Sequence, residues 1–148
     1  MTALFFSSVG YIYDRTHTKT ISELGGISRT MPVASAFFIL AALASMGIPL
    51  LATFWGELLV FIAAFKVYPV RAVIAVSALV VSALFMLRVI QKTCYGPEKP
   101  KYEGLRDVSL KLGLPRIILA AVLLLMGLFP SLLLNVIQTA SIPFMHGL

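Results

Sequence analysis

Apolar and polar residues alternate in long blocks along this chain. Apolar runs occupy residues 1–13, 32–65, 68–90 and 116–137, and polar connectors occupy residues 14–31 and 91–115. About 20 apolar residues can cross a membrane as one helix, whereas about 13 cannot. The pattern therefore predicts an all-α membrane protein with three full transmembrane helices and an N-terminal partial helix, within a single membrane domain over residues 1–148.

The second apolar run, residues 32–65, is too long for one straight membrane helix. At about 1.5 Å per residue it would extend about 51 Å, against a hydrocarbon layer of about 30 Å. A hairpin at Gly47-Ile48-Pro49 would leave legs of about 15 residues, which is too short to span. Pro49 has no N–H for the carbonyl of Ser45, and Gly47 loosens the same turn. We therefore predict one long helix that is discontinuous near Gly47 and Pro49.

Composition favours a membrane location over a soluble one. Hydrophobic residues make up 59% of the chain and charged residues 12%, whereas charged residues are about 25% of a soluble domain. The net charge of +6 would suggest nucleic acid in a soluble protein, but here the cations flank apolar runs. We therefore expect the lipid bilayer as a partner and no nucleic acid.

The lysines and arginines are unevenly distributed between the two ends of the predicted helices. Ten of the twelve lie in or beside the connectors 14–31 and 91–115, and only Lys66 and Arg71 flank the turn between the second and third runs. If the second run crosses once, these ten cations fall on one side of the membrane. The positive-inside rule assigns that side to the cytoplasm or the matrix, where we expect both connectors.

Glu57 is the one carboxylate inside an apolar run, since the other five lie in the connectors. Desolvation disfavours the charged form, and an ionisable residue at membrane depth is a functional candidate. Pro49, Thr53 and Glu57 recur every four residues and would share one helix face. The pattern predicts a proton path through Glu57, supported by Thr53, Ser45, Gly47 and Pro49. The alternative is a neutral glutamic acid that hydrogen-bonds a neighbouring helix, with an ordinary kink beside it.

His17, in the first connector, is a weaker candidate. Imidazole titrates near neutral pH and could relay protons, although a solvated loop histidine is the simpler interpretation. No metal-ligand cluster, phosphate-binding loop or nucleophile arrangement accompanies Glu57 in the sequence. We therefore expect ion movement without catalytic residues, cofactor or metal in this chain.

The stretch from Gly10 to Phe61 closely resembles the antiporter-like membrane subunits of respiratory complex I (NADH:quinone oxidoreductase), in particular the chain 4 type. The similarity is strongest in three motifs, namely Tyr13-Asp14-Arg15-Thr16-His17-Thr18-Lys19 through Gly25-Gly26, Ala44-Ser45-Met46-Gly47-Ile48-Pro49, and Phe54-Trp55-Gly56-Glu57. It weakens but continues through residues 91–96, where Tyr95-Gly96 is also similar to the family.

This resemblance implies that residues 32–65 are the discontinuous helix that carries the ionisable residue of a proton half-channel, with Glu57 at that position. Related subunits usually carry a lysine there, so the glutamate favours the chain 4 type. The resemblance also implies a subunit of a translocating oxidoreductase with no redox residues of its own. Its location would be an energy-transducing membrane, either the prokaryotic cell membrane or the mitochondrial inner membrane.

Subunits of this kind contain many more membrane helices than this chain. We therefore expect other membrane subunits as partners, including a companion chain that supplies the N-terminal helices, as in a split subunit. Related hydrogenases and cation/proton antiporters are alternative parent complexes. Two further hypotheses are a structural membrane subunit without its own ion path and a free-standing small transporter.

Overall fold

The computed structural model describes residues 1–131 except 103 and 106, together with 134–135 and 137. Its elements are α1 (Thr2–Thr16), α2 (Ile27–Thr30), α3 (Pro32–Ser45), α4 (Ala52–Val67), α5 (Pro69–Cys94), the 3-10 turn η1 (Pro100–Tyr102) and α6 (Leu110–Leu128). The described part of the chain contains no strand. The all-α prediction is confirmed.

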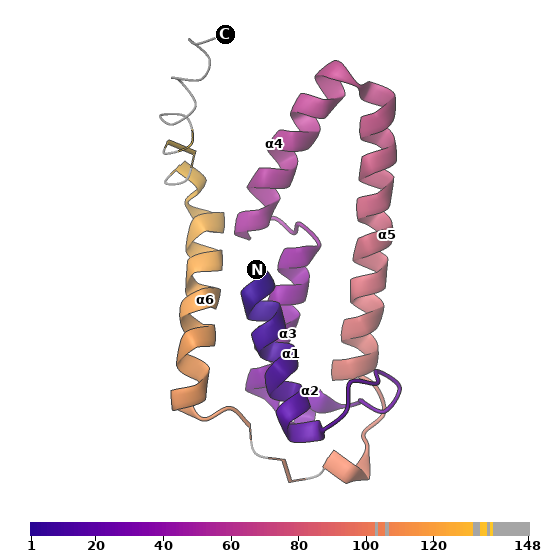
Figure 1. The fold of residues 1–148 in the computed structure, drawn as a ribbon, viewed down its shortest axis with the longest axis vertical. Helices are drawn as coiled ribbons and strands as arrows, with labels where there is room; N and C mark the ends of the chain where they lie inside the picture. Colours follow the sequence, from indigo (N-terminus) through magenta and orange to yellow (C-terminus); the bar gives the residue numbers. More distant parts are fainter. Residues whose placement is uncertain (103, 106, 132–133, 136, 138–148) are drawn as a thin grey trace.

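Residues 32–65 form two helices, α3 and α4, which are separated by a non-helical segment. α3 and α4 follow one another along the long axis of the molecule, and α5 runs back beside both (Figure 1). Both connectors lie at the end opposite to the turn between α4 and α5 (Figure 1). Among the described helices, α5 alone is long and apolar enough to cross a membrane unaided. The count of three full crossings stays a prediction.

Several helix boundaries differ from the predicted ones. α1 continues past residue 13 to Thr16, α2 lies inside the first connector, and α5 continues to Cys94. α6 begins at Leu110 rather than 116 and passes through Pro115, which removes one backbone hydrogen bond without ending the helix. It ends at Leu128, and the predicted continuation to 137 includes residues 132–133 and 136, which lie outside the described residues.

Small residues let α3 pack closely at the centre of the molecule. Its buried positions are mostly alanine and serine, which allow neighbouring helix backbones to approach. α1 and α6 contact α3 on one side through a cluster that contains Leu4, Ala41, Ala44, Leu51, Ala120 and Leu123. α3 is therefore the helix around which the others assemble.

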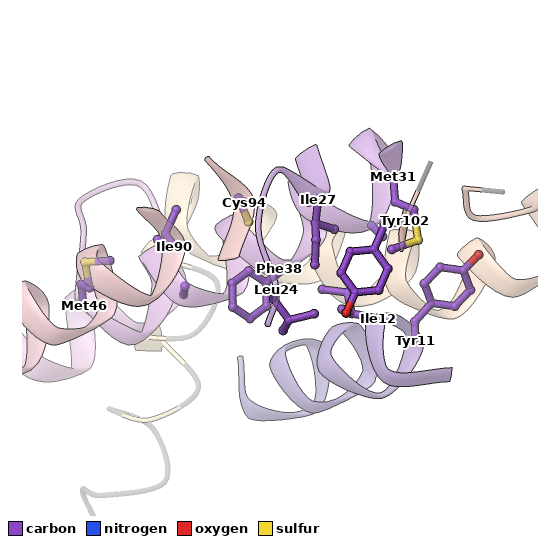
Figure 2. Close-up of a cluster of buried hydrophobic side chains, with 12 residues drawn as sticks. Tyr11, Ile12, Leu24, Ile27, Met31, Phe38, Met46, Ile90, Cys94 and Tyr102 are labelled. Atoms are coloured by element: carbon purple, nitrogen blue, oxygen red, sulfur yellow. The ribbon is translucent and has the colours of Figure 1, made fainter. Parts of the chain in front are cut away.

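The larger hydrophobic cluster joins both connectors to α1, α3 and the end of α5, and it reaches Met46, just beyond the end of α3 (Figure 2). Phe38 of α3 and Leu24 of the first connector lie side by side in it, and Ile27 and Met31 are fully buried. The cluster consists of Tyr11, Ile12, Leu24, Ile27, Met31, Phe38, Ala42, Met46, Ile90, Cys94, Tyr102 and Ala34. The two polar connectors are thus folded onto the helices.

Polar contacts join the two connectors to each other and to α3. The hydroxyl of Ser28 donates to the carbonyl of Cys94 at 2.6 Å, and Arg29 forms an ion pair with Glu98. Asp107 accepts hydrogen bonds from the backbone N–H groups at the start of α3, at 2.7 Å from Val33 and 3.2 Å from Ala34. Because the first N–H groups of a helix have no partner within it, Asp107 stabilises the beginning of α3.

Candidate functional site at the helix break

The candidate site is the non-helical segment 46–51, which we call the break. Gly47 (φ 66°) and Leu50 (φ 81°) both adopt left-handed backbone conformations. Glycine adopts this conformation at little cost, whereas a side chain makes it unfavourable by about 1–2 kcal/mol. Leu50 is 64% exposed and therefore gains little from burial of its side chain. The packing around the break must hold its backbone in this shape.

Thr53 bridges the two sides of the break. Its hydroxyl donates to the carbonyl oxygen of Ala44 at 2.6 Å, and the backbone N–H of Gly47 donates to the same oxygen at 3.2 Å. An interrupted helix leaves carbonyls without their usual partners, and such groups are costly at membrane depth. Thr53 therefore connects the first turn of α4 to the last turn of α3.

The carboxyl group of Glu57 lies directly against Gly47. A Cβ added to Gly47 would overlap Oε2 of Glu57 and lie 2.9 Å from its Cδ. Glu57 is partly buried in the second turn of α4. The structure therefore places the one carboxylate of the apolar runs on the backbone of the break.

The remaining predicted site residues are placed differently. Pro49 lies in the break and outside α4, so the prediction that it shares a helix face with Thr53 and Glu57 is wrong. The reason is that the interruption covers the whole of 46–51, which removes the helical register between Pro49 and Thr53. The hydroxyl of Ser45 donates to the carbonyl of Ala41 at 3.0 Å.

His17 is not brought to the break. It is the exposed residue that ends α1, with a left-handed backbone (φ 54°) and an edge contact to the ring of Tyr13. The end of α1 lies with the connectors, whereas α4 extends from the break toward the opposite end (Figure 1). The two candidate proton carriers of the sequence are therefore separated along the long axis.

Comparison with known proteins places this arrangement in a family. Residues 1–84 match the family model described as NADH:quinone oxidoreductase/Mrp antiporter, TM, which covers both the break and Glu57. The chain belongs to this family. Together with the length of α5, membership makes it an integral membrane protein.

Curated relatives carry the name NADH-quinone oxidoreductase subunit M. The protein of that name from Pseudomonas aeruginosa is 37% identical over 149 residues, which is 98% of this chain and 28% of that protein. The Mycobacterium tuberculosis protein is 32% identical, over 94% of this chain and 25% of that protein. The Rickettsia prowazekii protein is 33% identical, over 88% and 27%. The chain thus spans about a quarter of the length of these antiporter-like relatives.

Two features of this family member were not predicted from the sequence. The indole N–H of Trp55 donates to the carbonyl oxygen of Gly127 in α6 at 2.8 Å. The sequence pattern assigns Arg116 to the connector cations, but the structure buries it in α6. Its Nη2 donates to the carbonyl of Ser7 at 3.0 Å, and its Cζ lies 4.8 Å from the centre of the Tyr11 ring. The sequence marks Trp55 as its single tryptophan and Arg116 as a cation beside an apolar run, but it does not identify their partners, which are distant along the chain.

Proposed function

We propose that the chain is part of a proton-translocating membrane subunit of a complex I-like NADH:quinone oxidoreductase, in which Glu57 takes and releases a proton. The observation that carries this proposal is the contact between the Glu57 carboxyl and Gly47 inside an interrupted apolar helix. Family membership and the name of the relatives agree with it. The chain 4 type is the finer assignment that the glutamate favours.

The break supplies what a proton carrier at membrane depth needs. Gly47 has no side chain, so the carboxyl can sit against the backbone and leave it without a steric barrier. An ionised carboxylate attracts water and donor groups, whereas a neutral one is tolerated in apolar surroundings. Loss and gain of the proton would therefore move the Glu57 side chain relative to Gly47. Thr53 keeps the two helices connected during that movement.

Under this proposal the chain works inside a larger assembly. Other membrane subunits, including a companion chain with the preceding helices, supply the rest of the proton path, and any redox cofactor belongs to those partners. Both connectors lie on the cytoplasmic or matrix side of an energy-transducing membrane. Their accumulation of positive charge supports this orientation.

The test replaces Glu57 by glutamine in the assembled complex. Glu57→Gln keeps the shape of the side chain but cannot release a proton, so we expect translocation through this subunit to fall about tenfold or more. Glu57→Asp keeps the carboxyl and is expected to restore most of the rate. The measurement is proton uptake by membrane vesicles per NADH oxidised, at equal amounts of assembled complex.

Glu23→Gln is the matched control. Glu23 is an exposed carboxylate of the first connector that accepts one hydrogen bond from Thr18, and its change to the amide should leave translocation unaltered. A Glu57→Gln complex that assembles normally and translocates as well as the wild type would contradict the proposal.

A structural role is the second candidate, and the same contact favours it. The Glu57 carboxyl fills space beside Gly47 and so also acts as packing between α4 and the break. If packing is its whole role, Glu57→Asp should lower the yield of assembled complex at least as much as Glu57→Gln does. A titrating role predicts the reverse order in the translocation assay.

A further inference from the structure

We propose that α6 holds the break in the shape that Glu57 requires, with Gly127 and Trp55 as positioning residues. This inference rests on the proposed function of Glu57. It adds Gly127, which is distant from the break in sequence, and Trp55, which lies on a different side of α4 from Glu57. It follows from three contacts between α6 and the segment that contains the break.

The first contact is a backbone approach that only glycine permits. A Cβ on Gly127 would overlap the carbonyl oxygen of Leu50 and lie 2.6 Å from Cα of Leu51. These atoms are backbone, so they cannot be moved aside by a side-chain rotation. The backbone of the break therefore rests directly on α6 at Gly127.

The second contact is the hydrogen bond from Trp55 to the same residue of α6. Gly127 is the penultimate residue of α6, and the last carbonyls of a helix have no partner within it. Trp55 donates its indole N–H to this free carbonyl at 2.8 Å. Trp55 thus completes the end of α6 and also fixes the first turns of α4 against it.

The third contact is apolar. Leu51, the last residue of the break, is 4% exposed and packs in the cluster that includes Ala120 and Leu123 of α6. α6 therefore holds the break by its backbone at Leu50, by the side chain of Leu51 and by the N–H of Trp55. This explains why the exposed Leu50 keeps a left-handed backbone.

These contacts and the Glu57 contact act on different sides of the same structure. Trp55 and Glu57 are two residues apart on α4 and so point in different directions. Trp55 faces α6, and Glu57 faces Gly47. A shift of Leu50 and Leu51 away from α6 would move Gly47 relative to the carboxyl, and misplacement by about 1 Å can reduce a rate about 100-fold.

The test compares Gly127→Ala with Gly56→Ala in the assembled complex. Both changes add one methyl group to a helical glycine, but a Cβ on Gly56 would meet no atom within 4 Å. We expect Gly127→Ala to speed hydrogen–deuterium exchange of the backbone amides of 46–48 and 50–51, and to lower translocation about tenfold or more. Gly56→Ala should leave both as in the wild type.

Trp55→Phe is the second variant, and it tests the contacts between α6 and the break even if Gly127→Ala fails to assemble. It removes the N–H and keeps an aromatic ring, so we expect exchange of the break to rise about 2- to 10-fold. Because both variants loosen the same packing of the break and α4 against α6, the double variant should be less affected than the two single effects combined.

A pH profile separates positioning of Glu57 from general loosening. Gly127→Ala should shift the pH at which translocation is half-maximal, and Gly56→Ala should not, because only the first moves Gly47 relative to the carboxyl. The other charged residues of α4, α5 and α6 are the same in both variants and cannot produce the difference, namely Lys66, Arg71, Arg88, Lys92, Lys111 and Arg116.

Two results would overturn the inference. One is unchanged exchange of the break in Gly127→Ala and in Trp55→Phe, which would mean that α6 does not hold it. The other is faster exchange of the break with wild-type translocation and a wild-type pH profile, which would mean that the contacts with α6 do not position the break for Glu57. Failure of the proposed function is recognised separately, since Glu57→Gln would then translocate normally in a background with α6 and Trp55 intact.

Discussion

The two ends of the molecule have similarly apolar helices but opposite packing. At the connector end, α1, α2, α3 and the end of α5 share a buried cluster, and α3 alone buries Ala34, Ser35 and Phe38 among others. Beyond the break, α4 has no buried residue, and large side chains such as Val60 and Val70 are more than 60% exposed. An apolar run therefore predicts that a helix is removed from water, but it does not predict whether protein or lipid covers that helix.

The exposed apolar surface of α4 and α5 fits a membrane protein. Large apolar patches are unfavourable in water, whereas hydrocarbon tails or neighbouring membrane helices cover them without that cost. The connector end instead makes its own apolar core, and Ser28, Arg29 and Asp107 provide partners for polar groups of the connectors and of α3. The break lies between these two regions, with the connector-end core on one side and the exposed helices on the other.

The largest expected effect comes from truncating the centre of the connector-end core. Phe38 is 3% exposed and Phe85, on α5, is 62% exposed, so the same change to alanine compares a buried position with an exposed one. We expect Phe38→Ala to destabilise the fold by about 3–5 kcal/mol because it leaves a cavity. Phe85→Ala should change stability by less than about 0.5 kcal/mol. The thermal stability of the purified complex measures both.

An equally large loss of stability with Phe85→Ala would contradict this expectation. It would mean that another protein chain, rather than lipid, packs on this part of α5 in the assembled complex.

A smaller effect is expected at Gly47. Gly47 and Gly104 both have left-handed backbones, with φ of 66° and 84°, but only a Cβ on Gly47 would meet the Glu57 carboxyl. Alanine should cost about 1–2 kcal/mol at each position through backbone strain. We expect Gly47→Ala also to lower proton translocation, because it displaces the carboxyl, whereas Gly104→Ala should leave translocation unchanged at equal assembly.

The smallest effect is expected at the start of α3. Asp107→Ala removes the acceptor for the N–H groups of Val33 and Ala34, which should cost about 1 kcal/mol. Asp107→Asn keeps an acceptor oxygen and should cost less. A melting curve of the complex compares the two. Equal losses would show that the negative charge, rather than the hydrogen bonds, stabilises the beginning of α3.

The sequence predicted the features that depend on local chemistry. Pro49 removes a backbone hydrogen bond and Gly47 loosens the same turn, so the position of the break was predicted from the residues themselves. The single carboxylate of the apolar runs identified Glu57 without any structure. Composition and charge placement likewise indicated a membrane protein with its connectors at one end.

The tertiary structure decided which groups meet at the break. Neither the contact of Leu50 with Gly127 nor the hydrogen bond from Trp55 is encoded by a spacing in the chain, because α6 follows only after α5 and the second connector. The wrong placement of Pro49 has the same origin, since packing extends the interruption over all of 46–51. A sequence specifies where a helix cannot continue, but the conformation of the interruption depends on the surfaces that pack against it.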